Sequence, residues 1–123
     1  FYHVVDKYDS QIKVSARSVF LQGVMLNDQW ARTSVKDHNE LLNTLNMVRE
    51  LCSSFGITIQ QLSIAYLVSL DRIDQIIIGT ISNDKLKDNM LSTKMQLDKL
   101  LTSAIDEISS TSKSWTNPRS WQL

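Results

Sequence analysis

Apolar and polar positions alternate near the start of the chain, in residues 12–18 (Ile-Lys-Val-Ser-Ala-Arg-Ser). A period of two residues predicts a β-strand there. Gly23 interrupts the apolar stretch that follows the strand. Residues 27–33 are mostly polar, and we expect them to form a loop.

A helical period follows this loop. Apolar side chains recur at intervals of three and four residues, which predicts one long helix with a buried stripe formed by Leu41, Leu45, Val48, Cys52 and Phe55. Ser34 and Asp37 have the spacing of a capping box at the start of that helix. Gly56 stands where a left-handed residue is expected to end it.

Helix and strand patterns also alternate in the second half of the chain. Thr58 and Gln61 form a second capping box, which opens an apolar helix over residues 60–70. The run at 76–78 is three isoleucines before Gly79, as in a strand covered on both faces. Ser82 opens a helix over residues 83–90. A last amphipathic helix is expected from Leu97, Leu100, Leu101, Ala104, Ile105 and Ile108.

Two strands separated by helices predict a parallel α/β arrangement with right-handed crossovers. Two strands alone leave both edges of a sheet open. The pattern therefore indicates part of an α/β layer whose other strands lie elsewhere. Residues 109–123 are rich in Ser and Thr, contain Trp115 and Trp121, and are expected to be an irregular tail.

Composition excludes several classes of protein. The 123 residues carry 13 Lys and Arg against 13 Asp and Glu, so no basic patch for nucleic acid or a membrane surface is indicated. One Cys excludes an internal disulfide, and with two His it leaves no Cys/His zinc site. No apolar run approaches the about 18 residues of a membrane span. We expect a cytoplasmic protein that binds neither nucleic acid nor membrane.

Residues that could bind a ligand follow the second predicted strand. Gly79 allows close approach of a ligand, Thr80 and Ser82 supply hydroxyls, and the next helix presents free N–H groups. Lys85 adds a positive charge one turn into that helix. The segment suits a phosphate. The alternative is purely structural: Gly79 turns the chain, Ser82 caps the helix and Lys85 is solvated.

Three segments share an order and spacing with one known family: residues 16–23, residues 57–67, and residues 76–80 continuing to Leu86 and Asn89. Together they resemble the aldo-keto reductase family. Residues 16–23 (Ala-Arg-Ser-Val-Phe-Leu-Gln-Gly) resemble its seventh strand. Residues 57–67 resemble the helix before its eighth strand, and residues 76–80, continuing to Leu86 and Asn89, resemble that strand and its adenosine-phosphate loop. The resemblance implies the C-terminal part of a TIM (β/α)8 barrel, which needs about 250 residues. The last two strands, their helices and the C-terminal helix would form a partial domain over 1–108, followed by the tail 109–123.

The family reduces carbonyl groups with NADPH, and the resemblance implies where NADP(H) would bind. The implied residues are Arg17 at the nicotinamide, Ser18, Phe20 and Gln22 along the pyrophosphate, Gly79, Thr80, Ser82 and Lys85 near the 2′-phosphate, and Asp88 and Asn89 at the adenine. Arg17 replaces an aromatic ring found in many members, and its planar guanidinium can also stack. Lys85 replaces an Arg and keeps the charge without the bidentate fork, so NAD(H) is the alternative cofactor.

The family's catalytic Asp, Tyr, Lys and His belong to strands that have no counterpart in this sequence. Tyr2, Tyr8 and Tyr66 lie in segments that resemble helices, so none is expected to protonate a carbonyl. We therefore expect no activity from the chain alone, and a partner that is either the missing N-terminal half of the barrel or a second copy. The alternatives are a non-catalytic nucleotide-binding or self-pairing half barrel, and a small helical protein with 76–78 inside a helix.

Overall fold

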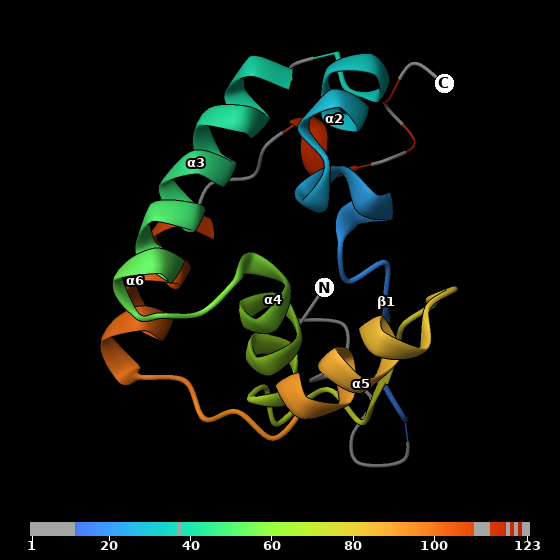
Figure 1. Cartoon of the computed structure of the whole chain (residues 1–123), viewed down its shortest axis with the longest axis vertical. Helices are drawn as coiled ribbons and strands as arrows, with labels where there is room; N and C mark the ends of the chain where they lie inside the picture. The colour runs from blue at the N-terminus through green and yellow to red at the C-terminus, as the bar shows by residue number, and fades with distance from the viewer. Residues whose placement is uncertain (1–11, 37, 110–113, 118, 120, 122–123) are drawn as a thin grey trace.

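The computed structural model of the chain describes residues 12–36, 38–109, 114–117, 119 and 121 (Figure 1). Strands β1 (Ser15–Arg17) and β2 (Gln75–Ile77) pair in parallel, with Ala16 opposite Ile76. The predicted strands and their parallel direction are confirmed, although each has three residues. The prediction that the isoleucine run is covered on both faces is wrong for the described chain, because the two-stranded sheet leaves Ile77 54% exposed.

The first segment after β1 contains a helix that the sequence pattern did not predict. A 3-10 segment, η2 (Leu21–Leu26), leads into α2 (Asp28–Ser34), where a loop was expected. Asn27 caps α2, because its Oδ1 accepts from the N–H of Trp30 at 3.1 Å. Only Ala31 and Ser34 of α2 are buried, so the helix has no apolar stripe. Ser34 ends α2 and does not cap the next helix; Asp37 lies outside the described residues.

The long predicted helix is confirmed as α3 (His38–Ser54), with Leu41, Leu45 and Cys52 buried. Phe55 is exposed, because it follows the last helical residue and leaves the stripe. Gly56 has φ +68°, as predicted for the residue that ends the helix. The N–H of Gly56 donates to the carbonyl of Ser53, and the N–H of Ile57 donates to that of Cys52. These two bonds make a Schellman end.

Replacing Gly56 with alanine should lower the free energy of unfolding by about 1 kcal/mol. A Cβ at this position would meet no atom within 4 Å, so the loss comes from left-handed backbone strain and not from a clash. Urea denaturation of both proteins measures the difference. Gly56→Asn should lose less, since Asn tolerates this conformation; equal stability of the alanine variant would contradict the account.

The remaining predicted helices are present. In α4 (Ile59–Val68) the capping box is complete: Thr58 Oγ1 accepts from the N–H of Gln61, and Gln61 Oε1 accepts from the N–H of Thr58. Ser82 caps α5 (Asn83–Ser92), as expected. The last helix is α6 (Lys99–Ser109). Leu101 on α6 is buried, whereas Leu100 points to solvent and does not belong to the stripe.

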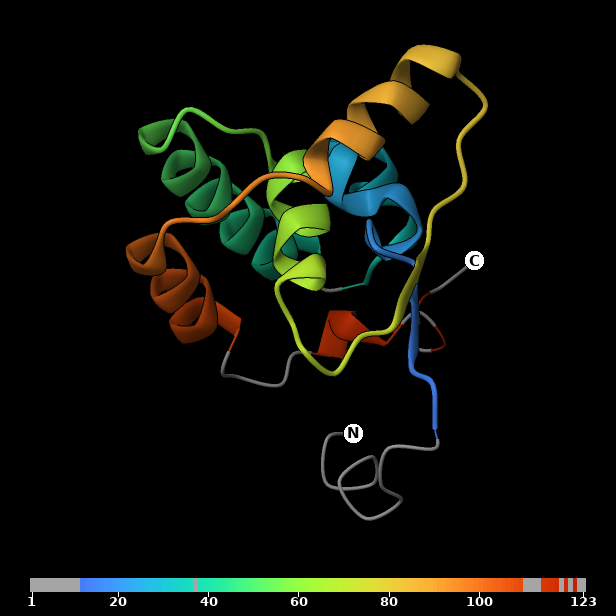
Figure 2. The same ribbon diagram turned by 90° about the horizontal axis from the view of Figure 1, so that it is seen from below.

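Two apolar clusters hold the helices on one side of the strand pair (Figure 2). The first joins η2, α2 and α3 around Val24, Ala31 and Leu41, and it includes Trp121 from the end of the chain. The second joins α3, α4 and α6 through Cys52, Leu62 and Leu101. The core therefore lies between helices, and the sheet stays at its margin.

No single helix among the described residues is long and apolar enough to cross a membrane. Taken together, α3 and α4 are long and apolar enough to span a membrane, but the two helices are bent by 85° relative to each other. This statement concerns length and composition only.

Candidate functional site

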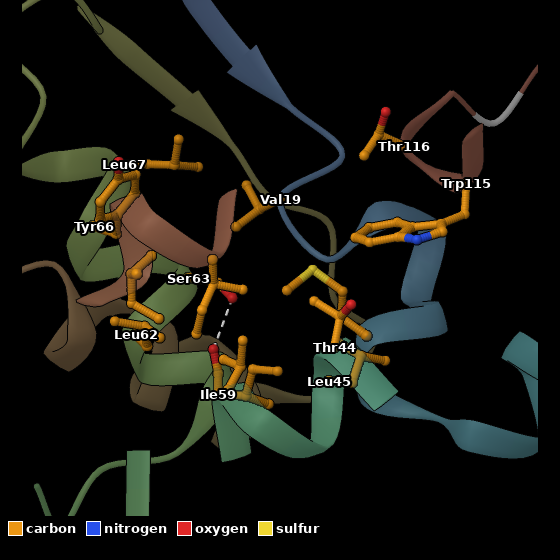
Figure 3. Close-up of a pocket in the computed structure, with 14 residues that line it drawn as sticks. Val19, Thr44, Leu45, Ile59, Leu62, Ser63, Tyr66, Leu67, Trp115 and Thr116 are labelled. Atoms are coloured by element: carbon orange, nitrogen blue, oxygen red, sulfur yellow. Dashed lines mark hydrogen bonds between the residues drawn. The ribbon is translucent and has the colours of Figure 1, made fainter. Parts of the chain in front are cut away.

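One hollow in the structure is almost entirely apolar (Figure 3). It has a volume of about 340 Å³ and lies between α3, α4, α6 and the 3-10 segment η3 (Ser114–Thr116). Its hydroxyl groups are already bonded: Ser63 Oγ donates to the carbonyl of Ile59, and Tyr66 OH donates to Asp106 Oδ1. The Nε1–H of Trp115 is buried with no acceptor among the described residues. None of the described residues that line this hollow carries a charge.

A second cleft, which we call the polar cleft because Gln60, Thr80, Lys85 and Asn89 contribute to its lining, lies where the two parallel strands end. Its volume is about 530 Å³, and it is lined by Phe20, Leu26, Gln60, Gly79, Thr80, Ile81, Lys85 and Asn89. These residues come from the segment after β1, the start of α4, the loop after β2, and α5. Figure 1 shows α5 on the side of the molecule where the strands lie. The carboxyl ends of parallel strands are where α/β folds bind ligands.

The loop after β2 forms one wall of the cleft through local hydrogen bonds. Thr80 Oγ1 accepts from the N–H of Ser82 at 3.3 Å, which fixes the turn before α5. Ser82 Oγ then accepts from the N–H of Lys85 at 3.4 Å. The N–H groups of Asn83 and Asp84 have no acceptor among the described residues. Such N–H groups at a helix start attract an anion.

Helix α5 places a cation and an amide side by side on the cleft. Lys85 and Asn89 are four residues apart, so they occupy the same helix face about 6 Å apart along its axis. Lys85 is exposed, while Asn89 is only 5% exposed. Asn89 Oδ1 accepts a hydrogen bond of 2.7 Å from Gln60 Nε2. Asp84 and Asp88 offset the charges of Lys85 and Lys87, so α5 has no net charge, and Lys85 is the charged residue of α5 that lines the cleft.

The wall of the cleft that follows β1 contains several residues in the left-handed backbone conformation. Ser18, Leu21 and Gln22 have φ of 57°, 47° and 53°, and Gly23 has φ 91°. For a bulky side chain such as Leu21 this conformation is strained. Strained residues of this kind gather at functional sites, where the surrounding structure holds them in place. Here they turn the chain sharply enough to bring Phe20 into the cleft.

The structure brings together half of the residues that the resemblance implied for the cofactor. Those that line the cleft are Phe20, Gly79, Thr80, Lys85 and Asn89. The others lie outside its lining: Arg17 ends β1, Ser18 and Gln22 are exposed in the left-handed segment, Ser82 caps α5, and Asp88 is exposed on α5.

Sequence reasoning missed Leu26, Gln60 and Ile81, which also line the cleft. Gln60 had a signal. It follows the cap residue by two positions, and Gln61 already satisfies the capping box. A second glutamine beside the box is therefore free to reach another element.

Other reactive side chains lie away from the cleft. Cys52 is buried between helices, and loss of hydration raises the pKa of its thiol, so it stays protonated as expected of an inert core residue. Tyr66 lies on α4 and is bonded to Asp106. Within the described part of the chain, no group of three or more His, Cys, Asp or Glu side chains is arranged to hold a metal ion.

Comparison with known protein families identifies the family of this chain. The sequence model of the aldo/keto reductase family matches residues 6–110, which is most of the chain. No curated protein matches the sequence. Because the match includes both strands and the whole loop from β2 into α5, the chain belongs to the aldo/keto reductase family.

Proposed function

We propose that this chain carries much of the NADP(H) site of an aldo-keto reductase, as the C-terminal part of its barrel. One observation supports this most: Thr80, Lys85 and Asn89 share a cleft at the ends of two parallel strands, next to the start of α5. A phosphate and a purine base are the ligand groups that such a set recognises.

The side chains present fit an adenosine that carries a phosphate. The Lys85 ammonium and the N–H groups of Asn83 and Asp84 suit the phosphate, with the Thr80 hydroxyl nearby. Asn89 keeps its Nδ2 hydrogens without an acceptor among the described residues, so it can donate to a ring nitrogen of the base. Phe20 and Leu26 supply apolar surface for the base. The exposed guanidinium of Arg17 and the backbone of residues 18–22 would hold the remainder of the cofactor.

In the whole enzyme the bound nicotinamide would supply the hydride that reduces a carbonyl group. The residues of this chain would bind and orient that cofactor, and none of the described side chains is placed to protonate the carbonyl. Tyr66 lies outside the cleft and is bonded to Asp106. We therefore expect the chain alone to hold the cofactor without turning over substrate.

The proposed partner is the remainder of the barrel. A TIM barrel has eight strands, and the sheet described here pairs β1 and β2 only. Among the described residues, each strand keeps an outer edge with no strand beside it, and Ile77 is half exposed on the sheet face. Such edges are normally covered or paired. Further strands would cover them, and pairing with a second copy is the alternative.

Calorimetric titration of the purified chain with NADPH, with NADH as the control, tests the proposal. We expect saturable binding of NADPH and weaker binding of NADH, because only NADPH carries the phosphate that Lys85 would contact. Circular dichroism must show that the sample is folded. Absence of NADPH binding by the folded chain would overturn the proposal, and carbonyl reduction by the chain alone would overturn the expected inactivity.

A further inference from the structure

Arg49 on α3 binds both the end of η2 and the start of α2. Its Nη1 and Nη2 atoms donate to the carboxylate of Asp28, in the first turn of α2, at 3.3 and 2.5 Å. Nη2 also donates to the carbonyl of Met25 at 3.5 Å, and Nη1 donates to Asn46 Oδ1, three residues earlier on α3. Two bonds to one carboxylate fix the plane of the guanidinium. Arg49 lines neither the polar cleft nor the apolar hollow.

The carbonyl that Arg49 contacts is connected to the cleft by further hydrogen bonds. The N–H of Met25 donates to the carbonyl of Phe20 at 3.4 Å, and the N–H of Gly23 donates to the same carbonyl at 2.8 Å. Phe20 lines the cleft. Leu26 also lines it, and its N–H belongs to the same planar peptide group as the Met25 carbonyl. Holding this one peptide group therefore constrains both apolar residues that the segment after β1 contributes to the cleft.

The segment needs support from its surroundings because its backbone is strained. Leu21 and Gln22 have left-handed φ values of 47° and 53°, and residues other than glycine keep this conformation only where neighbouring structure holds them. Burial of Val24 in the first apolar cluster supplies one support. The ion pair of Arg49 and Asp28 supplies a second, and its side chains are 32% and 48% exposed. A partly exposed pair of this kind contributes a factor of about three to an equilibrium.

We propose that Arg49 is a positioning residue: through Asp28 and the Met25 carbonyl it holds one wall of the polar cleft in place, and so raises the affinity for the cofactor without touching it. This inference rests on the proposed function, in which that wall supplies apolar surface to the ligand. A wall that is already in place loses less conformational freedom on binding. Release of the wall should therefore weaken NADPH and NADH by the same factor, unlike loss of Lys85.

Amide hydrogen exchange of the full chain tests the positioning without any ligand. Arg49→Met keeps an unbranched side chain and removes its donors, so exchange at Leu21 and Gly23, whose N–H groups bond within the segment, should rise about threefold. Exchange at Leu62, buried in α4, should stay unchanged. Arg32→Met removes the same charge from an exposed residue of α2 and should alter none of these rates. Unchanged exchange at Leu21 and Gly23, or an equal rise at Leu62, would overturn the proposal.

Calorimetric titration with NADPH and NADH tests the effect on the cofactor. Arg49→Met should weaken both about threefold, and Arg32→Met should weaken neither. Asp28→Ala separates positioning from general electrostatic attraction, because it removes a negative charge. Attraction alone predicts that an anionic nucleotide then binds more tightly, whereas positioning predicts that it binds more weakly.

The outcomes separate this inference from the proposed function. Tighter or unchanged NADPH binding by Asp28→Ala, or equal weakening by Arg49→Met and Arg32→Met, would overturn the role of Arg49 and leave the cofactor site intact. A wild-type chain that binds neither nucleotide would overturn the proposed function and the effect on affinity with it. Exchange at Gly23 would still decide whether Arg49 holds the wall.

Discussion

Replacing Lys85 with alanine is expected to weaken NADPH binding about tenfold and to leave NADH binding nearly unchanged. A hydrogen bond between charged groups contributes about 1.5–3 kcal/mol, and each 1.4 kcal/mol is a factor of about ten in affinity. Lys85 is the lysine that lines the cleft, and only NADPH carries the additional phosphate. The preference between the two cofactors should therefore fall with the loss of this one charge. Titration of both variants with both nucleotides measures it.

Lys87 provides the matched control for Lys85. It lies two residues further along α5, is exposed and does not line the cleft, so its side chain faces another direction. Lys87→Ala should change NADPH affinity little. Lys85→Arg should restore or improve NADPH binding, because the guanidinium can contact a phosphate through two donors. Equal weakening by Lys85→Ala and Lys87→Ala would mean that general charge, and not a defined phosphate contact, attracts the nucleotide.

Truncation of Leu101 to alanine is expected to lower the free energy of unfolding by about 3 kcal/mol. Leu101 is 1% exposed and packs against Cys52 and Leu62, so it attaches α6 to α3 and α4. Removing its side chain leaves a cavity where these three helices meet. Urea denaturation monitored by circular dichroism measures the change in stability.

Leu100 is the control on the same helix. Its side chain is 74% exposed, so Leu100→Ala should change stability by less than about 0.5 kcal/mol. Similar losses from Leu100→Ala and Leu101→Ala would contradict the orientation of α6. A stable Leu101→Ala chain would show that α6 is not part of the folded core.

Three helix ends and the two strands were predictable from the sequence because they depend on local chemistry, whereas the cap predicted at Ser34 was wrong. The capping box of Thr58 and Gln61, the cap at Ser82 and the left-handed Gly56 each follow from residues within one or two turns. The direction of the strands followed from the helices between them.

Other features depend on contacts that sequence spacing does not reveal. Helix α2 buries only Ala31 and Ser34, too few residues to give a helical period. Leu100 continues an apolar pattern, yet it faces solvent because the neighbours of α6 lie on its other sides. Phe55 also continues a pattern, but it lies after the last residue of α3 and leaves the buried stripe. Gln60 reaches the cleft because α4 packs on α5. Exposure of Ile77 reflects the number of strands in the sheet, which a local pattern does not specify.

The most direct test of the central claim, that the polar cleft is a site for NADP(H), is an amide-resolved NMR titration of the chain with NADPH. We expect the largest shifts of backbone amide signals at Gly79, Thr80, Asn83, Lys85 and Asn89, together with the side-chain amide signals of Gln60 and Asn89. Amides around the apolar hollow, such as those of Ser63 and Tyr66, should change little. Shifts confined to the apolar hollow, or no saturable shifts in a folded sample, would contradict the account.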